Sequence, residues 1–329
     1  MNPTAKAQIG KTALQVTRMG MGGAALGGLY HEVSDADATA AVGAAVALGV
    51  NHFDTAPLYG HGLSERRMGE ELRKVPRESF VLSTKVGRVL VPAKGKVESF
   101  WFDHPAPFEP VFDFSYDGVM RSFEDSLKRL GLERVDILYI HDPDDNYDEA
   151  LLGAYPALAR LRSEGVVSAI GAGMNQAEML ARFAREGDFD CFLLAGRYTL
   201  IDQSGLAELL PLCERKKISI VVGGPYNSGI LAGGALSGSK FDYKSAAPEV
   251  VAKVHRVQGV ALRHGISLKA AALQFPLAHP AVVSVIPGAR SATEVEENFR
   301  LMAVEIPGDF WQELRAERLL PEEAPVPDH

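Results

Sequence analysis

The chain has 329 residues, of which 47% are hydrophobic, and its formal net charge is −8. This length suits one large barrel or two ordinary domains, and the acidic balance argues against nucleic acid as a partner because phosphate binding needs a basic face. The two cysteines, Cys191 and Cys213, are too few for a disulfide framework or a zinc cage. We expect both to be buried core residues.

The hydropathy of the chain predicts its compartment. Residues 1–10 contain no apolar segment of the signal-peptide kind, and no apolar run is long enough to span a bilayer. We therefore expect a cytoplasmic protein that binds a small molecule and has neither a membrane nor a nucleic-acid partner. The composition leaves its oligomeric state open.

Short apolar runs alternate with amphipathic segments along the chain. A hairpin is expected over residues 7–16, and a Pro-rich tail at 321–329 is expected to be loose. Strands are predicted at 18–23, 50–54, 80–85, 135–140, 167–172, 190–194, 218–223 and 281–286. Helices are predicted at 35–48, 64–73, 115–130, 147–163, 176–185, 205–216, 250–264, 268–278, 292–302 and 309–319, with Ser34 and Ser64 as N-caps of the first two.

This alternation predicts a parallel sheet. About eight strands are expected, the number that closes a (β/α)₈ TIM barrel. An open doubly wound sheet would instead require a G-x-G-x-x-G turn after its first strand, and the spacing of Gly20, Gly22 and Gly23 does not match it. No linker interrupts the chain, so we predict a single barrel domain over 1–329, with an N-terminal β-hairpin.

Polar residues stand at the ends of three predicted strands. Asp54, Lys85 and His141 each end a strand, and Tyr59 lies on the loop after Asp54. In a barrel all strand ends point to one rim, so these four side chains could converge. Taken singly, each has an ordinary explanation, such as a snorkelling lysine or a structural histidine.

Together, these four groups suit proton transfer. A phenol has a pKa of about 10, which we expect the Lys85 ammonium to lower. Asp54 would hold that ammonium, and His141 would orient the reacting oxygen. The result is a proton donor or acceptor beside a carbonyl or alcohol carbon. No H-E-x-x-H or Cys/His pattern indicates a metal, and no G-x-S-x-G elbow indicates a serine hydrolase.

Four motifs give the chain a family resemblance: Phe-Asp-Thr-Ala-Pro-Leu-Tyr-Gly at 53–60, Ser-Thr-Lys at 83–85, Asp-Ile-Leu-Tyr-Ile-His at 136–141, and Ile-Pro-Gly at 286–288 followed by Glu297-Asn298. Over nearly its whole length the chain resembles the aldo-keto reductases. The resemblance implies that Asp54, Tyr59, Lys85 and His141 form the family's catalytic tetrad. It further implies hydride transfer with a nicotinamide cofactor, Tyr59 as general acid or base, and no metal.

The same resemblance implies a dinucleotide across the barrel mouth, with its adenine end near residues 286–298. The small residues at 223–229 suit a pyrophosphate. Gly223 stands where many members stack a tyrosine on the nicotinamide, and Asn175 is the remaining candidate for the amide contact. The candidate cofactor residues are Gly22, Gly23, Asp54, Asn175, Gly224, Asn227, Ser228, Gly229, Gly288, Arg290, Glu294, Glu297 and Asn298.

The choice between NAD and NADP depends on the adenine end. Members that prefer NADP usually carry basic residues at places that hold Gly288 and Glu294 here. A carboxylate would repel a 2′-phosphate and could accept bonds from ribose hydroxyls, so we predict NAD as the preferred cofactor and NADP as the alternative. Two points weigh against this: Arg290 could reach a phosphate, and Glu294 could simply cap the last turn.

Residues 86–115 form a long predicted loop rich in aromatic side chains. We expect this segment to be a substrate wall or lid, with Trp101 and Phe102 contacting the substrate beside Tyr59 and His141. The alternative is an excursion that buries its own rings. Its aromatic residues are Phe100, Trp101, Phe102, Phe108, Phe112 and Phe114.

This insertion, the segments 117–126 and 140–143, and Gly-Gly-Pro-Tyr-Asn-Ser-Gly at 223–229 resemble one branch of the family. That branch contains D-threo-aldose (L-fucose) 1-dehydrogenases, L-galactose dehydrogenases and pyridoxal 4-dehydrogenase. The resemblance implies oxidation of an aldose such as L-fucose, D-arabinose or L-galactose to a lactone, with Tyr59 as base. Pyridoxal oxidation to 4-pyridoxolactone is the close alternative, and a cofactor-sensing partner protein with little turnover is an alternative of another class.

Overall fold

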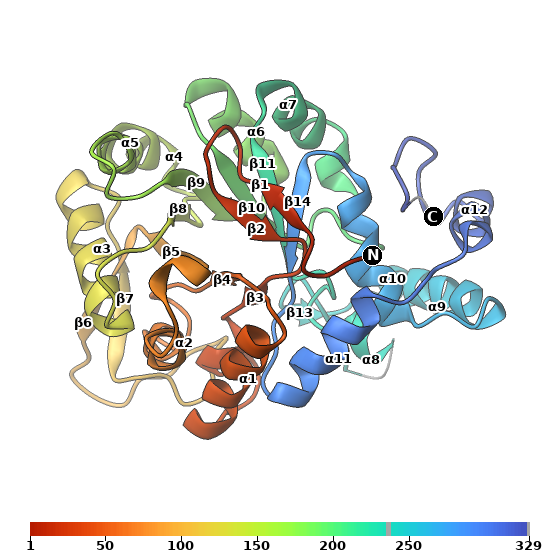
Figure 1. Ribbon diagram of the computed structural model, residues 1–329, viewed down its shortest axis with the longest axis horizontal. Coiled ribbons are helices and arrows are strands. Elements are labelled where there is room, and N and C mark those ends of the chain that lie inside the picture. Colours follow the sequence, from red (N-terminus) through yellow and green to blue (C-terminus); the bar gives the residue numbers. More distant parts are fainter. Residues whose placement is uncertain (235–237, 328–329) are drawn as a thin grey trace.

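A closed parallel sheet forms the centre of the computed structural model, which describes residues 1–234 and 238–327 (Figure 1). Its eight strands follow the order β14-β11-β10-β9-β8-β5-β4-β3. Parallel bridges from Met19 to Val285 and from Gly22 to Gly288 join the first strand to the last. The expected (β/α)₈ barrel is therefore confirmed. The strands are β3 (Met21–Gly22), β4 (His52–Asp54), β5 (Val81–Val86), β8 (Ile137–His141), β9 (Ala169–Met174), β10 (Cys191–Ala195), β11 (Ser219–Gly223) and β14 (Val282–Ile286).

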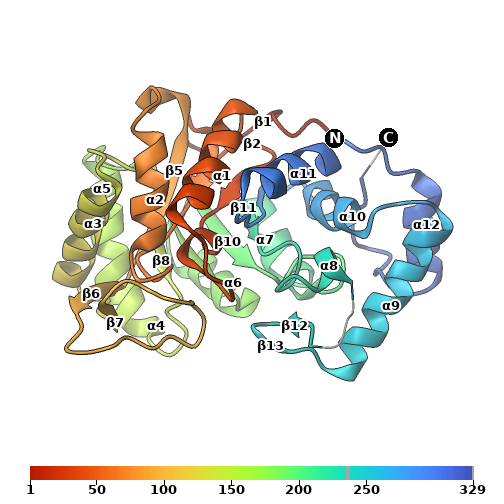
Figure 2. The same ribbon diagram turned by 90° about the horizontal axis from the view of Figure 1, so that it is seen from below.

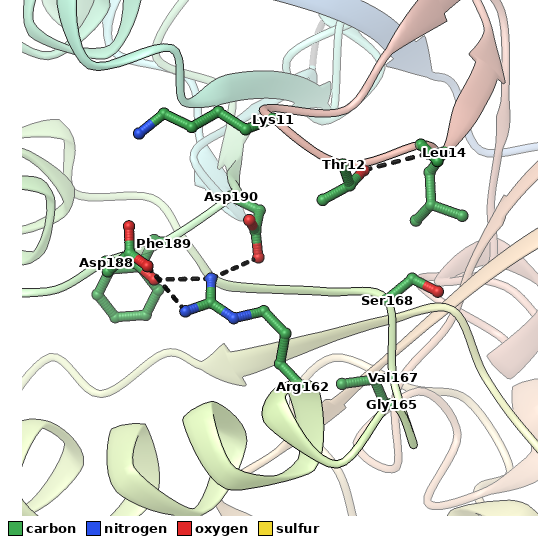
Figure 3. Close-up of a pocket in the computed structure, with 11 residues that line it drawn as sticks. Lys11, Thr12, Leu14, Arg162, Gly165, Val167, Ser168, Asp188, Phe189 and Asp190 are labelled. Atoms are coloured by element: carbon green, nitrogen blue, oxygen red, sulfur yellow. Dashed lines mark hydrogen bonds and ion pairs between the residues drawn. The ribbon is translucent and has the colours of Figure 1, made fainter.

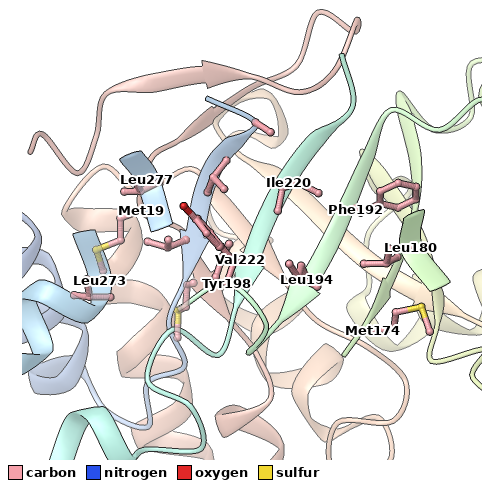
Figure 4. Packing of buried hydrophobic residues seen from close by; sticks show 14 of the residues in the cluster. Met19, Met174, Leu180, Phe192, Leu194, Tyr198, Ile220, Val222, Leu273 and Leu277 are labelled. Carbon is pink, nitrogen blue, oxygen red and sulfur yellow. The ribbon is translucent and has the colours of Figure 1, made fainter. Parts of the chain in front are cut away.

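The strands are buried on both faces. Along β10, Cys191 and Leu193 belong to one apolar cluster, whereas Phe192 and Leu194 belong to a second and larger one. Successive side chains of a strand point to opposite faces, so the smaller cluster fills the barrel and the larger one packs beneath the helices. Figure 4 shows Phe192 and Leu194 on this outer layer together with Ile220 and Val222 of β11.

Helices surround the sheet (Figure 1). Ser34 caps the first one as predicted, since its side chain accepts from the Asp37 amide. The prediction that Ser64 caps the second is wrong: Gly62, at φ 97°, holds that place. The buried Ser64 hydroxyl instead donates to the Gly23 carbonyl at 2.7 Å. The helices are α1 (Asp35–Ala47), α2 (Leu63–Leu72), α3 (Tyr116–Leu130), α4 (Tyr147–Glu149), α5 (Tyr155–Ser163), α6 (Ala177–Glu186), α7 (Leu209–Lys216), α8 (Ile230–Gly233), α9 (Pro248–Arg263), α10 (Leu268–Gln274), α11 (Ala292–Met302) and α12 (Gly308–Ala316).

Two sequence-based expectations about outer segments need correction. The helix predicted at 147–163 is divided into α4 and α5 by a π-helical turn at Ala150–Ala154. The tail is not loose where the structure describes it, because Ala324 is fully buried and its carbonyl accepts a hydrogen bond from Arg315. Residues 328–329, the end of the tail that was predicted to be loose, lie outside the described part of the chain.

Different hairpins lie at the two ends of the barrel (Figure 2). The expected N-terminal hairpin, β1 (Lys6–Gln8) and β2 (Gln15–Thr17), lies at one end and sends Ile9 and Val16 into the inner core. At the opposite end lie two antiparallel ribbons that the sequence analysis did not predict. They are β6 (Arg88–Pro92) with β7 (Phe108–Phe112), inside the supposed loop, and β12 (Lys240–Phe241) with β13 (Lys244–Ser245).

A pocket of about 630 Å³ adjoins the β1–β2 turn (Figure 3). In it the Arg162 guanidinium contacts Asp188 and Asp190, at 2.9 Å each. Since Asp190 directly precedes β10, this pocket lies at the amino ends of the strands, away from the predicted tetrad. Among the described helices none is both long and apolar enough to cross a membrane.

Candidate active site

The structure brings the four candidate catalytic residues together. Lys85 on β5 reaches across to β4, where its Nζ lies 2.7 Å from Asp54 Oδ2. The same Nζ lies 4.6 Å from the centroid of the Tyr59 ring. The His141 ring, at the end of β8, stands nearly perpendicular to the Tyr59 ring with 5.7 Å between centroids. Parallel strands that end at one rim thus place an ammonium and an imidazole against the same phenol.

The Asp54–Lys85 pair is a buried structural unit. The two side chains are 3% and 1% exposed, and the Ser83 hydroxyl donates to the second Asp54 oxygen at 2.7 Å. Burial raises the pKa of Asp54, while the Lys85 ammonium and the Ser83 hydroxyl oppose that rise. Removing either partner of such a pair leaves an uncompensated buried charge, so Asp54 fixes the Lys85 ammonium against the phenol ring.

The pKa of Tyr59 differs from the sequence-based expectation. Burial and the carboxylates of Asp54 and Asp142 raise the pKa of Tyr59 well above its ordinary value. Arg88 is the cation that opposes this rise. The net shift is therefore opposite to the expected one, because burial and the two carboxylates outweigh the cations beside the phenol. Tyr59 is a protonated phenol at neutral pH.

His141 is an uncharged imidazole. Burial and the nearby Arg88 and Lys85 cations lower its pKa well below the ordinary value. A neutral imidazole can donate one hydrogen bond and accept another. His141 can therefore orient a reacting oxygen beside Tyr59 without carrying a charge.

A cleft of about 570 Å³ extends from Tyr59 towards α11. The dinucleotide candidates all line it, although their role in binding remains a prediction. Near its middle, Gly224 and Gly229 have φ of 57° and 94°, and an added Cβ at Gly229 would meet nothing within 4 Å. Within the described chain, the buried Asn227 Oδ1 has no hydrogen-bond partner. An open backbone with an unpaired buried acceptor suits an elongated polar ligand such as a dinucleotide. The predicted residues that line the cleft are Gly22, Gly23, Asp54, Asn175, Gly224, Asn227, Ser228, Gly229, Gly288, Arg290, Glu294, Glu297 and Asn298.

At the α11 end of this cleft, two cations are each paired with a glutamate. The Arg290 guanidinium donates to Glu294 at 2.6 Å, and the Arg290 backbone amide donates to the same carboxylate at 2.8 Å. Lys269, which the sequence analysis did not single out, contacts Glu297 at 2.5 Å. Glu294 thus both stabilises the turn before α11 and compensates the Arg290 charge.

A second cavity of about 360 Å³ opens on the other side of Tyr59. Trp101 and Phe102 line it with Tyr59 and His141. Phe102 is buried, with its ring 6.2 Å from that of Tyr59, whereas Trp101 is 40% exposed. This part of the insertion is a wall of the cavity, and its role in substrate binding stays a prediction. The insertion does not simply bury its own rings, because Phe100 and Phe112 are exposed and Phe114 packs in the large core cluster.

Several residues of the cavities carried no prediction from the sequence. Tyr243 lies at the tip of the β12–β13 ribbon and lines both cavities, and its phenol contacts the Asn175 side chain. Arg88 and Asp142 form an ion pair of 3.1 Å inside the second cavity. Arg88 and Asp142 lie two or three residues beyond the ends of predicted strands, which was the available signal, whereas Tyr243 had none.

Comparisons with known proteins agree with this geometry. An eight-stranded barrel whose strand ends hold this tetrad defines a class of NAD(P)-dependent oxidoreductases, and the present chain is one of them. The family model described as "Aldo/keto reductase family" matches residues 18–317. The chain belongs to the aldo/keto reductase family.

Two characterised relatives resemble the chain over nearly its whole length. It is 41% identical to pyridoxal 4-dehydrogenase of Microbacterium luteolum, covering 96% of this chain and 98% of that protein. It is 39% identical to D-threo-aldose 1-dehydrogenase of a Pseudomonas species, covering 94% and 96%. Both enzymes belong to the branch of the family that the sequence motifs resemble.

Solved structures support the fold. An aldo-keto reductase of Bacillus halodurans in its holo form superimposes with a TM-score of 0.76, with 24% identity and 99% of each chain covered. The glycerol dehydrogenase of Gluconobacter oxydans gives a TM-score of 0.77, with 23% identity and 99% and 98% of the two chains covered. At these identities the match supports the barrel architecture only.

Proposed function

We propose that this protein oxidises a cyclic hemiacetal, such as an aldose, at C1 to a lactone, with NAD as hydride acceptor and Tyr59 as general base. One observation carries the proposal: Tyr59 lines both the elongated cleft and the smaller cavity. A substrate in the smaller cavity and a dinucleotide in the cleft would therefore both border the phenol. Of the other three, Asp54 lines only the cleft, and Lys85 and His141 line only the smaller cavity.

The roles of the side chains follow from their positions. The Tyr59 oxygen, as phenolate, takes the proton of the anomeric hydroxyl, and His141 donates a hydrogen bond that holds that hydroxyl in place. When bound, the nicotinamide ring accepts the hydride that leaves C1. The C1–H bond breaks with its electron pair, and the C1–O bond becomes the lactone carbonyl. Lys85, held by Asp54 over the phenol ring, stabilises the negative charge while Tyr59 is deprotonated.

The cofactor residues would act by shape and charge. The segment at 224–229 would hold the pyrophosphate, Asn175 the nicotinamide amide, and the residues from Gly288 to Asn298 the adenosine. Because Glu294 already pairs with Arg290, that cation is not free for a 2′-phosphate, and the carboxylate would repel one. This arrangement supports NAD over NADP.

The relatives support two related substrates. D-threo-aldose 1-dehydrogenase supports an aldose, and the charged groups of the smaller cavity suit a hydroxyl-rich ring. Pyridoxal 4-dehydrogenase supports pyridoxal, whose aromatic ring would suit the exposed Trp101 face. Both substrates present a cyclic hemiacetal to the same base, so the reaction is shared and the ring differs.

The test is a panel of L-fucose, D-arabinose, L-galactose and pyridoxal with NAD, using the native chain and Tyr59→Phe. We expect NAD-dependent oxidation of at least one aldose, and a loss of kcat of about a hundredfold or more in Tyr59→Phe with cofactor binding retained. Turnover of pyridoxal alone would select the second substrate. Turnover of none would overturn the proposal, and full activity in Tyr59→Phe would remove this residue from the mechanism.

A further inference from the structure

A charged cluster lies in the smaller cavity, outside the tetrad. Arg88 begins β6 and Asp142 follows β8, and one guanidinium nitrogen of Arg88 lies 3.1 Å from Asp142 Oδ2. Arg88 is 8% exposed, although it carries a full charge. Asp144 lines the same cavity. Two carboxylates therefore face one guanidinium beside the reacting phenol.

The hydrogen bonding of this cluster is incomplete. In the part of the chain that the structure describes, Arg88 Nε and Asp144 Oδ1 are buried without a partner. Leaving such groups unpaired is costly, and more so when they are charged. One is a donor and the other an acceptor, and both belong to residues that line the cavity. With a shift of these side chains towards the cavity, a ligand that accepts from Arg88 and donates to Asp144 would satisfy both atoms.

Asp142 has an unusual backbone conformation. Its φ is +41°, in the left-handed region that a non-glycine residue seldom adopts. The Asp142 amide donates to the Gly173 carbonyl at 3.0 Å, and its Oδ2 lies 3.4 Å from His141 Nε2. The carboxylate is thus fixed within one residue of the group that orients the reacting oxygen, where a second substrate hydroxyl would lie.

We propose that Arg88, Asp142 and Asp144 form a subsite that recognises the ring hydroxyls of a neutral, unphosphorylated substrate. This inference rests on the proposed function and narrows its substrate class. A hydroxyl is both donor and acceptor, so vicinal hydroxyls match one guanidinium flanked by carboxylates. A phosphorylated sugar would face two carboxylates against one cation and would be repelled.

The test uses Asp142→Asn, which keeps the side-chain shape and removes the charge. Two substrates are compared: the best aldose with NAD, and 4-nitrobenzaldehyde, which has no ring hydroxyl, with NADH. We expect the ratio of kcat/KM for aldose to that for nitrobenzaldehyde to fall about tenfold or more, mainly through the KM of the aldose. An equal fall for both substrates would assign Asp142 a general role and overturn the subsite, as would no change in the ratio.

A binding measurement separates this inference from the proposed reaction. A 1,5-anhydroalditol keeps ring hydroxyls but has no anomeric hydroxyl to oxidise, so it is assayed as an inhibitor of nitrobenzaldehyde reduction. We expect inhibition that weakens about tenfold or more in Asp142→Asn, and none by an aldose phosphate. If no aldose is oxidised but this inhibition is seen, the proposed reaction fails and the subsite stands. Inhibition that Asp142→Asn leaves unchanged overturns the subsite.

Asp136→Asn is the matched control. Asp136 forms a similar partly buried pair with Arg77, at 2.7 Å, directly before β8 and at the opposite end of that strand. Losing this pair can lower stability, but it leaves the cavity intact. We expect neither the substrate ratio nor the inhibition to change, and a matching change in Asp136→Asn would show that any lost ion pair produces the effect.

Discussion

At the scale of the residue, the site depends on a phenol whose pKa is governed by burial. The Lys85 ammonium is paired with Asp54 and lies 4.6 Å from the centroid of the Tyr59 ring. With burial and two carboxylates raising its pKa, Tyr59 keeps its proton at neutral pH. It accepts one only in the small fraction of molecules that hold a phenolate.

This protonation state predicts opposite pH behaviour for the two directions of reaction. Oxidation should speed up with rising pH, by about tenfold per unit where the phenolate is the minor form, whereas reduction by the phenol should stay nearly flat. Both rates are measured from pH 7 to 10, above the pKa of about 6 to which burial raises Asp142. An oxidation rate that falls between pH 7 and 9 would contradict a Tyr59 base.

Glu294 gives a second prediction, on cofactor choice. Glu294→Gln removes the carboxylate that pairs with Arg290 at 2.6 Å and releases the guanidinium for a 2′-phosphate. We expect the ratio of kcat/KM for NADP to that for NAD to rise about tenfold, measured with one substrate. The control is Glu296→Gln, an exposed position on the same helix, which should leave the ratio unchanged. No shift in Glu294→Gln would show that Glu294 only stabilises the turn.

How much of the site could be predicted from sequence depends on the kind of signal. The convergence of Asp54, Lys85 and His141 was predictable because a barrel brings the carboxyl ends of its strands to one rim. The Tyr59 pKa was not, because it depends on desolvation by side chains distant in sequence, such as Asp142. Tyr243 could not be predicted either, because a tyrosine does not indicate the left-handed backbone conformation that it adopts at the tip of the ribbon.

At the scale of the element, most helices and strands were predictable because their periodicity reports one buried face. The prediction for 292–302 matches α11 residue for residue. The two ribbons at the catalytic end were missed for a physical reason. β12 and β13 have two residues each and no alternating apolar pattern to detect. β6 does contain an apolar run, Val-Leu-Val at 89–91, but the prediction of one long loop passed over it.

The β12–β13 ribbon presents Tyr243 to the site. Asp242 and Tyr243 form its tip with φ of 52° and 62°, where asparagine and glycine are usual. The tip is held from two sides, by the Asp242–Arg197 ion pair at 2.9 Å and by the Tyr243 amide donating to Ser228 at 3.1 Å. Since residues held in such conformations cluster at functional sites, we expect Tyr243 to take part in binding.

Tyr243→Phe tests that position. Removing the hydroxyl takes away its contact with Asn175, and we expect the KM of the substrate to rise about three- to tenfold with a smaller effect on kcat. Tyr116→Phe is the control, because its hydroxyl accepts from Arg160 at 2.8 Å on the outer helices. If both variants behave as the native chain does, Tyr243 plays no part in binding.

At the scale of the whole molecule, the barrel separates stability from chemistry. The β1–β2 hairpin covers the amino ends of the strands and carries Ile9 and Val16, both fully buried, into the inner core. Figure 2 shows the two ribbons at the other end, where β4 ends at Asp54 and β8 ends at His141. In such barrels the two ends can vary independently, so a defect in the hairpin should weaken the fold without reaching the site.

Ile9→Ala puts this separation to the test. The substitution leaves a cavity in the inner core, and we expect the free energy of unfolding in urea to fall by about 2–5 kcal/mol. Lys11→Ala, on the exposed turn of the same hairpin, should change it by less than about 0.5 kcal/mol. In both variants kcat and KM, assayed well below the unfolding transition, should match the native values, because the altered side chains lie across the barrel from Tyr59. A kcat that falls in Ile9→Ala but not in Lys11→Ala would mean that packing at the closed end positions the tetrad, and the two ends would then be one mechanical unit.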